Sequence, residues 1–160
     1  MKRILLLSDS HGNLNNMADA VRSTRPDLIF HLGDCWNDAL RLEKLFPKIP
    51  MKKVVGNCDW DQGPAELIVE VEGKKFLICH GHAYGVKMSL LTLELSAREK
   101  QVDVALYGHT HRLFYDYLSG LTIINPGSIG APPRGIPASY AVLTVDAGMD
   151  QVKMESFYLE

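Results

Sequence analysis

Two short segments of the chain place histidine at a spacing that suits metal binding. Asp9-Ser10-His11 and His109-Thr110-His111 each separate two potential ligands by one residue. At the end of a strand this spacing is expected to direct both side chains to the same side, so that each segment can chelate an ion. Three more potential ligands stand alone: Asp34, Asn57 and His80. Two carboxylates, one amide and four imidazoles form a ligand set for more than one metal ion.

Each of these ligands follows a short apolar run, and the runs cover residues 4–7, 28–32, 54–55, 76–79 and 102–107. A short apolar run is typical of a buried parallel strand. In open α/β sheets, the ligand site lies beyond the carboxyl ends of the strands. We therefore expect the seven side chains to lie along one rim: Asp9, His11, Asp34, Asn57, His80, His109 and His111.

A pair of divalent ions at this rim would suit a phosphoester substrate. The ions bring four positive charges, whereas Asp9 and Asp34 return two negative ones, so the site stays cationic. A carboxylate has two oxygens and can bridge two cations, and Asp34 is the residue predicted for that role. Metals roughly 3.5–4 Å apart clamp the attacking and leaving oxygens and lower the pKa of a bound water. Imidazole and oxygen ligation without thiolate favours Mn²⁺, with Ni²⁺, Zn²⁺, Fe²⁺ or Co²⁺ as alternatives, over Ca²⁺.

The elements that must position these ligands alternate at first. Strands predicted at 3–8, 28–32 and 51–55 enclose two helices, the first capped by Asn13 and each followed by a proline, Pro26 or Pro47. This βαβαβ order is typical of a parallel layered sheet. Hairpins at 65–79 and 113–125, a helix at 88–98, a strand at 102–107 and final strands at 140–145 and 152–158 follow. The mixture predicts a two-sheet sandwich with outer helices.

The bulk composition narrows the function classes. A chain of 160 residues favours one domain, here residues 1–160. Its 17 basic and 19 acidic residues give no general attraction to nucleic acid or to an anionic membrane. The three cysteines lack CxxC spacing and favour a reducing cytoplasm over a disulfide framework. Neither a signal peptide nor a run long enough to span a membrane is evident.

The order of the ligand segments resembles the calcineurin-like metallophosphoesterases. Among these, the chain resembles the YfcE-type phosphodiesterases in its small size and in the segments Gly56-Asn57-Cys58-Asp59 and Asn125-Pro126-Gly127-Ser128. The matching segments are Asp9-x-His11, Gly33-Asp34, Gly56-Asn57, His80 and Gly108-His109-x-His111, which span about two thirds of the chain. The resemblance implies a four-layer α/β-β/β sandwich and two metal ions. It assigns Asp9, His11, Asp34 and His111 to one ion and Asp34, Asn57, His80 and His109 to the other. The last four residues are also the ones expected to act in catalysis.

Cys58 departs from the pattern of the superfamily. Many members carry histidine directly after the motif asparagine, where it is thought to protonate the leaving group or to steady the phosphate. A thiol with a reference pKa of about 8.5 is a poor substitute proton donor. We therefore expect a preference for good leaving groups, and hydrolysis of phosphodiesters by a metal-bound hydroxide rather than fast hydrolysis of monoesters. Cys58 itself is predicted to face the substrate.

Several residues near the ligands have two interpretations each. His82 either approaches the substrate or completes its turn, and His31 is expected to support the ligands rather than to bind metal. Trp36 and Trp60 either line the cleft or pack at the sandwich edge. Asn125-Pro126-Gly127-Ser128 is expected to form a plain turn rather than to contact phosphate. Arg134 is expected to be a solvated charge rather than an anion ligand. Cys35 and Cys79 are expected to be buried.

Other enzymatic activities and a non-catalytic role are the alternatives to a phosphodiesterase. A phosphatase or nucleotide-polyphosphate hydrolase would use the same ligands, whereas a Vps29-like binding scaffold would not need them intact. Nuclease action on long polymers is disfavoured, because no basic stripe with interleaved aromatics is present. Loops at 60–64, 82–87 and 129–137 are expected to select a small phosphoester substrate. The apolar hairpin near Phe114–Leu121 is a candidate edge for a homodimer.

Overall fold

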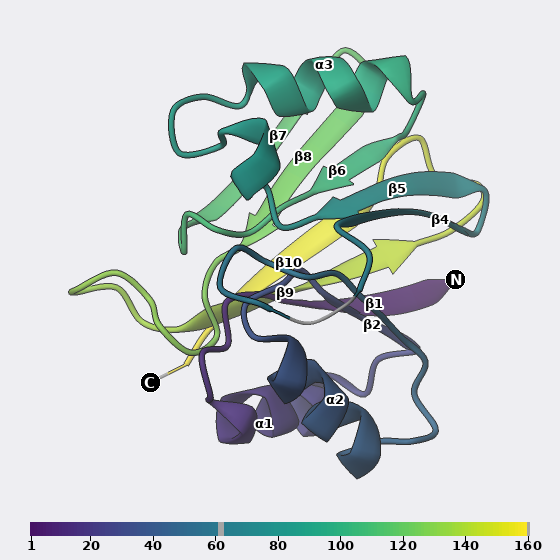
Figure 1. Cartoon of the computed structure of the whole chain (residues 1–160). Helices are drawn as coiled ribbons and strands as arrows, with labels where there is room; N and C mark the ends of the chain where they lie inside the picture. Colours follow the sequence, from purple (N-terminus) through teal and green to yellow (C-terminus); the bar gives the residue numbers. More distant parts are fainter. Residues whose placement is uncertain (61–62, 160) are drawn as a thin grey trace.

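The computed structural model describes residues 1–60 and 63–159 of the chain, which form two sheets between layers of helices (Figure 1). The elements in chain order are β1 (Lys2–Leu7), α1 (Leu14–Thr24), β2 (Leu28–His31), α2 (Trp36–Leu45), β3 (Met51–Lys53), β4 (Glu66–Val71), β5 (Lys74–Cys79), the 3-10 turn η1 (His82–Tyr84), α3 (Leu91–Glu99), β6 (Val104–Leu106), β7 (Leu113–Leu118), β8 (Leu121–Pro126), β9 (Ser139–Val145) and β10 (Lys153–Tyr158).

Each sheet combines parallel strands with antiparallel neighbours. The first sheet has the order β10-β9-β1-β2-β3, and β1, β2 and β3 run parallel to one another. The second sheet has the order β4-β5-β6-β8-β7, and β5, β6 and β8 run parallel. Both predicted hairpins are present, as β4–β5 and β7–β8. The antiparallel strands therefore lie at the outer positions, and the parallel strands carry the ligand segments.

Burial on both faces explains why the parallel strands read as continuous apolar runs. In β1, Ile4 and Leu6 pack into the core between the two sheets, whereas Leu5 and Leu7 face the outer core that the α1 residue Met17 shares. A third core packs α3 against the second sheet. Figure 1 shows α1 and α2 on one outer face and α3 on the other. The layers are helix, sheet, sheet and helix, which confirms the predicted four-layer sandwich.

Helix boundaries follow local chemistry. The Asn13 side chain accepts a hydrogen bond from the backbone N–H of Asn16, as predicted for an N-cap. Helix α1 ends at Thr24, its C-cap Arg25 is left-handed at φ 47°, and Pro26 follows. The third helix begins at Leu91 and not at Met88, which is exposed in a preceding turn. No helix within the described ranges is long and apolar enough to cross a membrane.

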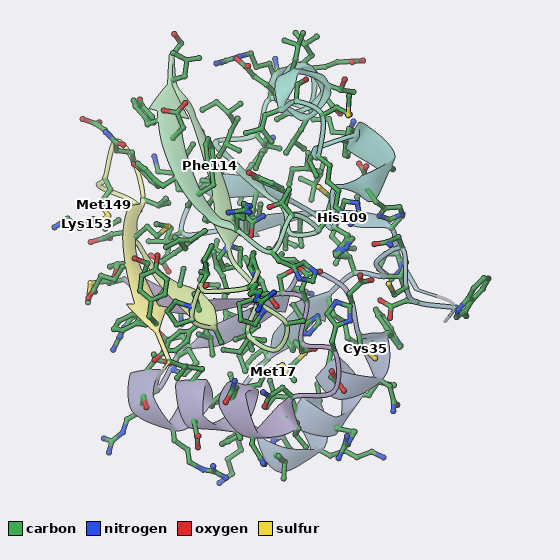
Figure 2. The ribbon with its side chains drawn as sticks, turned by 90° about the vertical axis from the view of Figure 1, so that its left-hand side faces the viewer. Met17, Cys35, His109, Phe114, Met149 and Lys153 are labelled. Carbon is green, nitrogen blue, oxygen red and sulfur yellow. The ribbon has the colours of Figure 1, made fainter. Side chains whose placement is uncertain are left out.

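The predicted rim is assembled from both sheets rather than from one. Strands β1, β2 and β3 supply Asp9, His11, Asp34 and Asn57, whereas β5 and β6 of the facing sheet supply the other histidines. In Figure 2, His109 and Cys35 lie on one side of the molecule, opposite Met149 and Lys153. The site therefore bridges the open end of the sandwich, where the two sheets meet.

Candidate metal centre

Backbone geometry at the strand ends aims the predicted ligands. Asp9, His11, Asp34, His109 and His111 all have positive φ values, between 40° and 70°. Such left-handed conformations are uncommon for residues other than glycine and tend to occur at functional sites. Each of these residues lies beyond the last residue of its strand, so the chain turns sharply where the ligand projects.

This turn corrects one expectation. Alternation along an extended strand describes neither chelating segment, because the ligands of both are left-handed. Asp9 and His11 nevertheless converge, with His11 Nε2 3.8 Å from Asp9 Oδ1, whereas His109 and His111 do not. Their side chains separate: the His111 ring lies 5.2 Å from that of His11, whereas the His109 ring lies 5.1 Å from that of His80. The two histidines therefore lie at opposite ends of the site.

Asp9 lies at the centre of the site. Its Oδ1 atom is 3.2 Å from His111 Nε2, 3.6 Å from His80 Nε2 and 3.8 Å from His11 Nε2. The other carboxylate oxygen, Oδ2, accepts hydrogen bonds from the Ser8 hydroxyl and the His109 backbone N–H. Oδ2 is therefore satisfied by protein donors, and Oδ1 is left facing three imidazoles.

Asp34 approaches the same imidazoles from the neighbouring strand end. Its Oδ2 atom lies 3.3 Å from His80 Nε2 and 3.9 Å from His11 Nε2, and its Oδ1 atom accepts from the Cys58 N–H at 3.0 Å. These contacts form two groups of ligand atoms, each close enough to hold an ion. One joins Asp9, His11 and His111, and the other joins Asp9, Asp34 and His80. Asp9 belongs to both groups, and Asp34 Oδ2 also lies between imidazoles of both.

The arrangement of acceptors indicates that a cation belongs here. His80 Nδ1 donates to the Leu32 carbonyl at 2.7 Å, so in the neutral ring Nε2 carries a lone pair directed at two carboxylates. Among the described residues, His80 Nε2 and Asp9 Oδ1 are the buried side-chain polar atoms without a hydrogen-bond partner. Buried acceptors that face one another repel unless a proton or a metal ion lies between them. The residues present therefore fit divalent metal.

The pKa values of the two carboxylates and of His80 depend on the contacts between them. Burial acts to raise the pKa of Asp9, but the neighbouring His11, His111 and His80 outweigh it and hold the pKa well below its ordinary range. Burial likewise opposes ionisation of Asp34, yet His80 and the Cys58 N–H lower its pKa to about 2. Burial acts to lower the pKa of His80, whereas Asp34 and Asp9 raise it, and the net direction is upward. The carboxylates are therefore ready to bind cations.

The remaining two predicted ligands, His109 and Asn57, lie beside these groups of carboxylates and imidazoles. His109 is half-buried, and its ring lies beside those of His80 and His82. Asn57 is exposed, and its side-chain amide contacts the Cys58 Sγ at 3.6 Å. The loop that carries Asn57 is fastened to Asp34 through the Cys58 N–H. These two residues therefore border the cluster on the side of Asp34 and His80.

Two motif glycines let the carboxylates approach the neighbouring loops. A Cβ atom at Gly56 would lie 2.0 Å from Asp34 Oδ1. A Cβ atom at Gly108 would lie 2.0 Å from Ser8 Oγ and 2.8 Å from Asp9 Oδ2. Any larger residue would displace the carboxylate that the site depends on, so glycine precedes the ligand in each segment for a steric reason.

A buried hydrogen-bond chain lies behind the ligands and joins three loops. His31 Nδ1 accepts from the Gly33 N–H at 3.2 Å, and His31 Nε2 lies 3.1 Å from Ser10 Oγ. The Ser10 hydroxyl donates to Asp38 Oδ2 at 2.8 Å, and the Gly12 N–H donates to the same oxygen. The chain fixes the backbone on both sides of His11 and the residue before Asp34. His31 thus supports the ligands, as predicted.

Asp59 is another supporting residue, and the sequence interpretation missed its role. Its Oδ2 atom accepts from the backbone N–H groups of Asp34 and Gly56, and its Oδ1 atom accepts from that of Trp36. It therefore locks the two ligand loops together. The only signal in the sequence is an aspartate placed to cap a turn after Gly56-Asn57.

Residues 125–128, which span the end of β8 and the start of the next loop, hold the site in place. Asn125 donates to the Gly108 carbonyl, and the Ser128 hydroxyl donates to the Asp9 carbonyl at 2.7 Å. The Gly127 N–H donates to Asn125 Oδ1, so it is already engaged. The segment is more than a turn, because it fastens the loops that carry Asp9 and His109.

Other predicted residues lie around the opening. His82 is exposed, and its ring lies 5.5 Å from that of His80; Cys58 is also exposed. Trp60 is 98% exposed, so it does not pack at the sandwich edge. Lys53 Nζ lies over the Trp36 ring, 5.1 Å from the ring centroid, in a cation–π contact. Cys79 is buried as predicted, Cys35 is only half-buried, and Arg134 is exposed. The predicted loop at 60–64 includes Asp61 and Gln62, which lie outside the described residues.

Comparison with known proteins identifies the family. The calcineurin-like phosphoesterase superfamily domain matches residues 1–148. The chain is 35% identical over 147 residues to the probable metallophosphoesterase YsnB of Bacillus subtilis, covering 89% of this chain and 84% of that protein. It is 27% identical over 174 residues to phosphodiesterase YfcE of Escherichia coli K12, covering 91% of this chain and 89% of that protein.

Solved structures show the same fold. A predicted phosphoesterase from Streptococcus pneumoniae superposes with a TM-score of 0.78 at 25% identity, covering 98% of both chains. A zinc-bound Vps29 from Entamoeba histolytica superposes with a TM-score of 0.76 at 20% identity, covering 98% of both chains, which is a likeness of fold alone. With the family match and the convergent ligands, the chain is an enzyme of the calcineurin-like phosphoesterase superfamily.

Proposed function

We propose that the chain is a phosphodiesterase that depends on two divalent metal ions. The observation that carries this proposal is the convergence of three acceptor atoms. His80 Nε2 lies 3.6 Å from Asp9 Oδ1 and 3.3 Å from Asp34 Oδ2. Such a convergence is costly without cations. Two overlapping ligand groups support a pair of ions rather than one.

Seven residues would hold the ions, in the division that the family resemblance implies. Asp9, His11, Asp34 and His111 would hold one, and Asp34, Asn57, His80 and His109 the other, with Mn²⁺ as the leading candidate and Ni²⁺, Zn²⁺, Fe²⁺ or Co²⁺ as alternatives. When bound, such ions acidify water and offset negative charge on phosphoryl oxygens. Asp34 Oδ2 lies near both His11 and His80, which supports Asp34 as the shared ligand. Asp9 Oδ1 is the other candidate for this role, because Asp9 belongs to both ligand groups.

The chain's own side chains contribute orientation and access. The Leu32 and Ala131 carbonyls fix the rings of His80 and His111 through their Nδ1 atoms, so each Nε2 is presented to the carboxylates. His82 and Cys58, both exposed beside Asn57, His80 and His109, would contact the ester groups of the substrate. A thiol in place of an imidazole supports a preference for diesters with good leaving groups over monoesters.

The alternatives differ in what they require. A phosphatase or nucleotide-polyphosphate hydrolase would use the same ions, and only Cys58 weighs against a phosphatase. A Vps29-like binding scaffold shares the fold, and one such protein binds zinc, so metal binding alone does not exclude it. The left-handed backbone at five predicted ligands, of which Asp9 and Asp34 are buried, supports the enzyme, because strain of this kind tends to occur at functional sites.

The proposal extends to the domain organisation, the cellular location, the substrate and the oligomeric state. Residues 1–160 would act as one domain, because both sheets share a core and both supply ligands. None of the cysteines is paired in the described chain, which supports a cytoplasmic location. The small substrate would bind without an extended nucleic-acid surface. Strand β7 is a sheet edge that exposes Tyr115, Tyr117 and Leu118, which supports pairing of two copies.

Hydrolysis assays test the proposal directly. Metal-stripped protein would be assayed with bis(p-nitrophenyl) phosphate and p-nitrophenyl phosphate while Mn²⁺, Ni²⁺, Zn²⁺ or Mg²⁺ is restored one at a time. Cleavage of the diester that needs metal and is lost in Asp34→Asn is the expected result. No turnover of either ester with any metal, despite bound ions, would reject the proposal in favour of a scaffold.

A further inference from the structure

A polar cavity opens directly beside His11, and His80 is not among the residues that line it. Its volume is about 430 Å³, and the residues that matter for its chemistry are His11, Asn13, Asn15, Arg41 and Gly130. These residues come from the start of α1, from the middle of α2 and from the loop after β8. Because His11 belongs to both the predicted metal centre and this cavity, a substrate bound at the metals can extend into it.

The walls of this cavity are held by hydrogen bonds. Asn13 Oδ1 accepts from the Asn16 N–H, which leaves the Asn13 side-chain NH₂ group available to a ligand. The Asn16 side chain donates to the Ile129 carbonyl at 2.9 Å and ties the loop after β8 to α1. Gly130 packs so closely on the Ser10 carbonyl that a Cβ atom there would lie 1.7 Å from its oxygen. The cavity is therefore preformed.

Charge in the cavity selects for an anion. Within the described ranges no carboxylate lines it, and Arg41 has no ion-pair partner. The two acids of its helix are engaged elsewhere: Asp38 is buried and accepts from Ser10 and Gly12, and Glu43 pairs with Lys53. Arg41 offers a planar fork of N–H groups, and Asn13 and Asn15 offer amide N–H groups. Guanidinium and amide donors that line one cavity suit the peripheral oxygens of a phosphate.

From this cavity we infer that the enzyme's substrate is a phosphodiester that carries a second phosphate, and that Arg41 binds that phosphate. The inference rests on the proposed phosphodiesterase activity and names the substrate class for it. The diester phosphorus would lie at the metal centre, and the arm on the His11 side would place its phosphate between Arg41, Asn13 and Asn15. Arg41 is thus a specificity-determining residue that does not touch the reacting atoms.

The test compares two esters that differ by one phosphate. The probes are the p-nitrophenyl ester of thymidine 5′-phosphate and the same ester with a 3′-phosphate, assayed with the metal-loaded enzyme. The wild-type ratio of kcat/KM should favour the phosphorylated ester by about tenfold, the factor expected from one hydrogen-bonded charge contact. In Arg41→Gln the ratio should fall to near one, and Arg41→Lys should retain part of it because the charge remains.

A matched control separates the cavity from general surface charge. Lys48→Gln removes one exposed positive charge outside the cavity and should leave the ratio at its wild-type value. A wild-type ratio of one, an unchanged ratio in Arg41→Gln, or an equal fall in Lys48→Gln would overturn the inference.

A binding measurement keeps this inference distinct from the proposed function. Calorimetric titrations would compare thymidine 3′,5′-bisphosphate with thymidine 5′-phosphate in wild type and Arg41→Gln. If no ester is hydrolysed with any metal, the phosphodiesterase proposal fails, and tighter binding of the bisphosphate that depends on Arg41 would still support the cavity. Equal binding of both nucleotides by wild type would overturn it.

Discussion

Asp9 Oδ1 and His80 Nε2 lie 3.6 Å apart, and in the described part of the chain neither atom has a hydrogen-bond partner. Asp9 follows the first strand of one sheet and His80 follows a parallel strand of the other, so this contact joins the two halves of the sandwich. Two buried acceptors in contact are unfavourable in isolation. A divalent cation between them would convert the repulsion into a crosslink between the sheets.

Metal should therefore stabilise the fold, and Asp9→Asn should remove most of that effect. At a free Mn²⁺ concentration of 100 times the Kd, binding adds about 2.7 kcal/mol, which for a chain of this size raises Tm by about 5–10 °C. Differential scanning calorimetry with chelator and with Mn²⁺ measures the shift. Asp116→Asn, an exposed carboxylate on β7, is the control and should keep it. A full shift in Asp9→Asn would show that the ion binds elsewhere.

Stability of the metal-free protein should fall as the pH drops below about 6.5, because of His31. Burial lowers the pKa of this imidazole from 6.5 to about 4, and its Nδ1 accepts the Gly33 N–H, which only an unprotonated nitrogen can do. The folded pKa lies below the unfolded one, so the unfolded state binds more protons between pH 6.5 and 4. The contribution of His31 is complete above that window and is lost as the pH falls through it, by about 2 kcal/mol between pH 7.5 and 5.

Urea unfolding of chelator-treated wild type and His31→Gln at several pH values checks this window. The variant should be less stable at pH 7.5 and should show a smaller loss between pH 7.5 and 5. His80 and His111, whose pKa values are raised, act in the opposite direction but are common to both proteins. Identical slopes would contradict the assignment, and an NMR titration of the His31 ring in wild type gives its pKa without any variant.

Much of the site could be located from sequence because each ligand ends an apolar run. Ser8-Asp9 and Cys79-His80 show this well: strands buried on both faces leave no alternation, so the first charged or imidazole residue marks the strand end. The pairing of the two sheets, in contrast, depends on contacts such as Phe30 with Phe76, which are distant in the chain. A predicted single rim therefore proved to be the meeting of two sheets.

Supporting residues were harder to predict than ligands. Ser10, His31 and Asp38 form one hydrogen-bond chain, yet they come from a loop, a strand and a helix, and no local pattern relates them. Asp9-Ser10-His11 and His109-Thr110-His111 share their spacing and their left-handed backbone angles, yet only the first pair converges. Composition and periodicity report burial and element type, whereas these features depend on tertiary packing.

Gly56→Ala should damage activity more than stability. The added Cβ would lie 2.0 Å from Asp34 Oδ1, and a shift of the carboxylate by about 1 Å is expected to cost about 100-fold in kcat. Gly148→Ala is the control, because a Cβ there meets nothing within 4 Å. Metal-dependent hydrolysis of bis(p-nitrophenyl) phosphate gives kcat, and circular dichroism melting gives Tm. Normal turnover in a folded Gly56→Ala protein would mean that Asp34 need not hold its present position.

The identity of residue 58 should set the choice between diesters and monoesters. Cys58 follows Asn57 at the exposed edge of the site, and its backbone N–H is fixed on Asp34, so a side chain placed there is held beside the ligands. An imidazole can protonate a leaving oxygen near neutral pH far better than a thiol. Cys58→His should therefore raise monoester hydrolysis relative to diester hydrolysis, and the gain should be largest for esters with poor leaving groups.

Assays of p-nitrophenyl phosphate, phenyl phosphate and bis(p-nitrophenyl) phosphate in wild type, Cys58→His and Cys58→Ser separate the explanations. Serine keeps the small size of the residue without adding an imidazole, so Cys58→Ser should keep the wild-type ratio. If Cys58→His leaves the diester-to-monoester ratio unchanged, proton donation at this position does not set the preference. The loops around His82 and Gly130, which border the site on its two sides, would then be the remaining determinants of substrate choice.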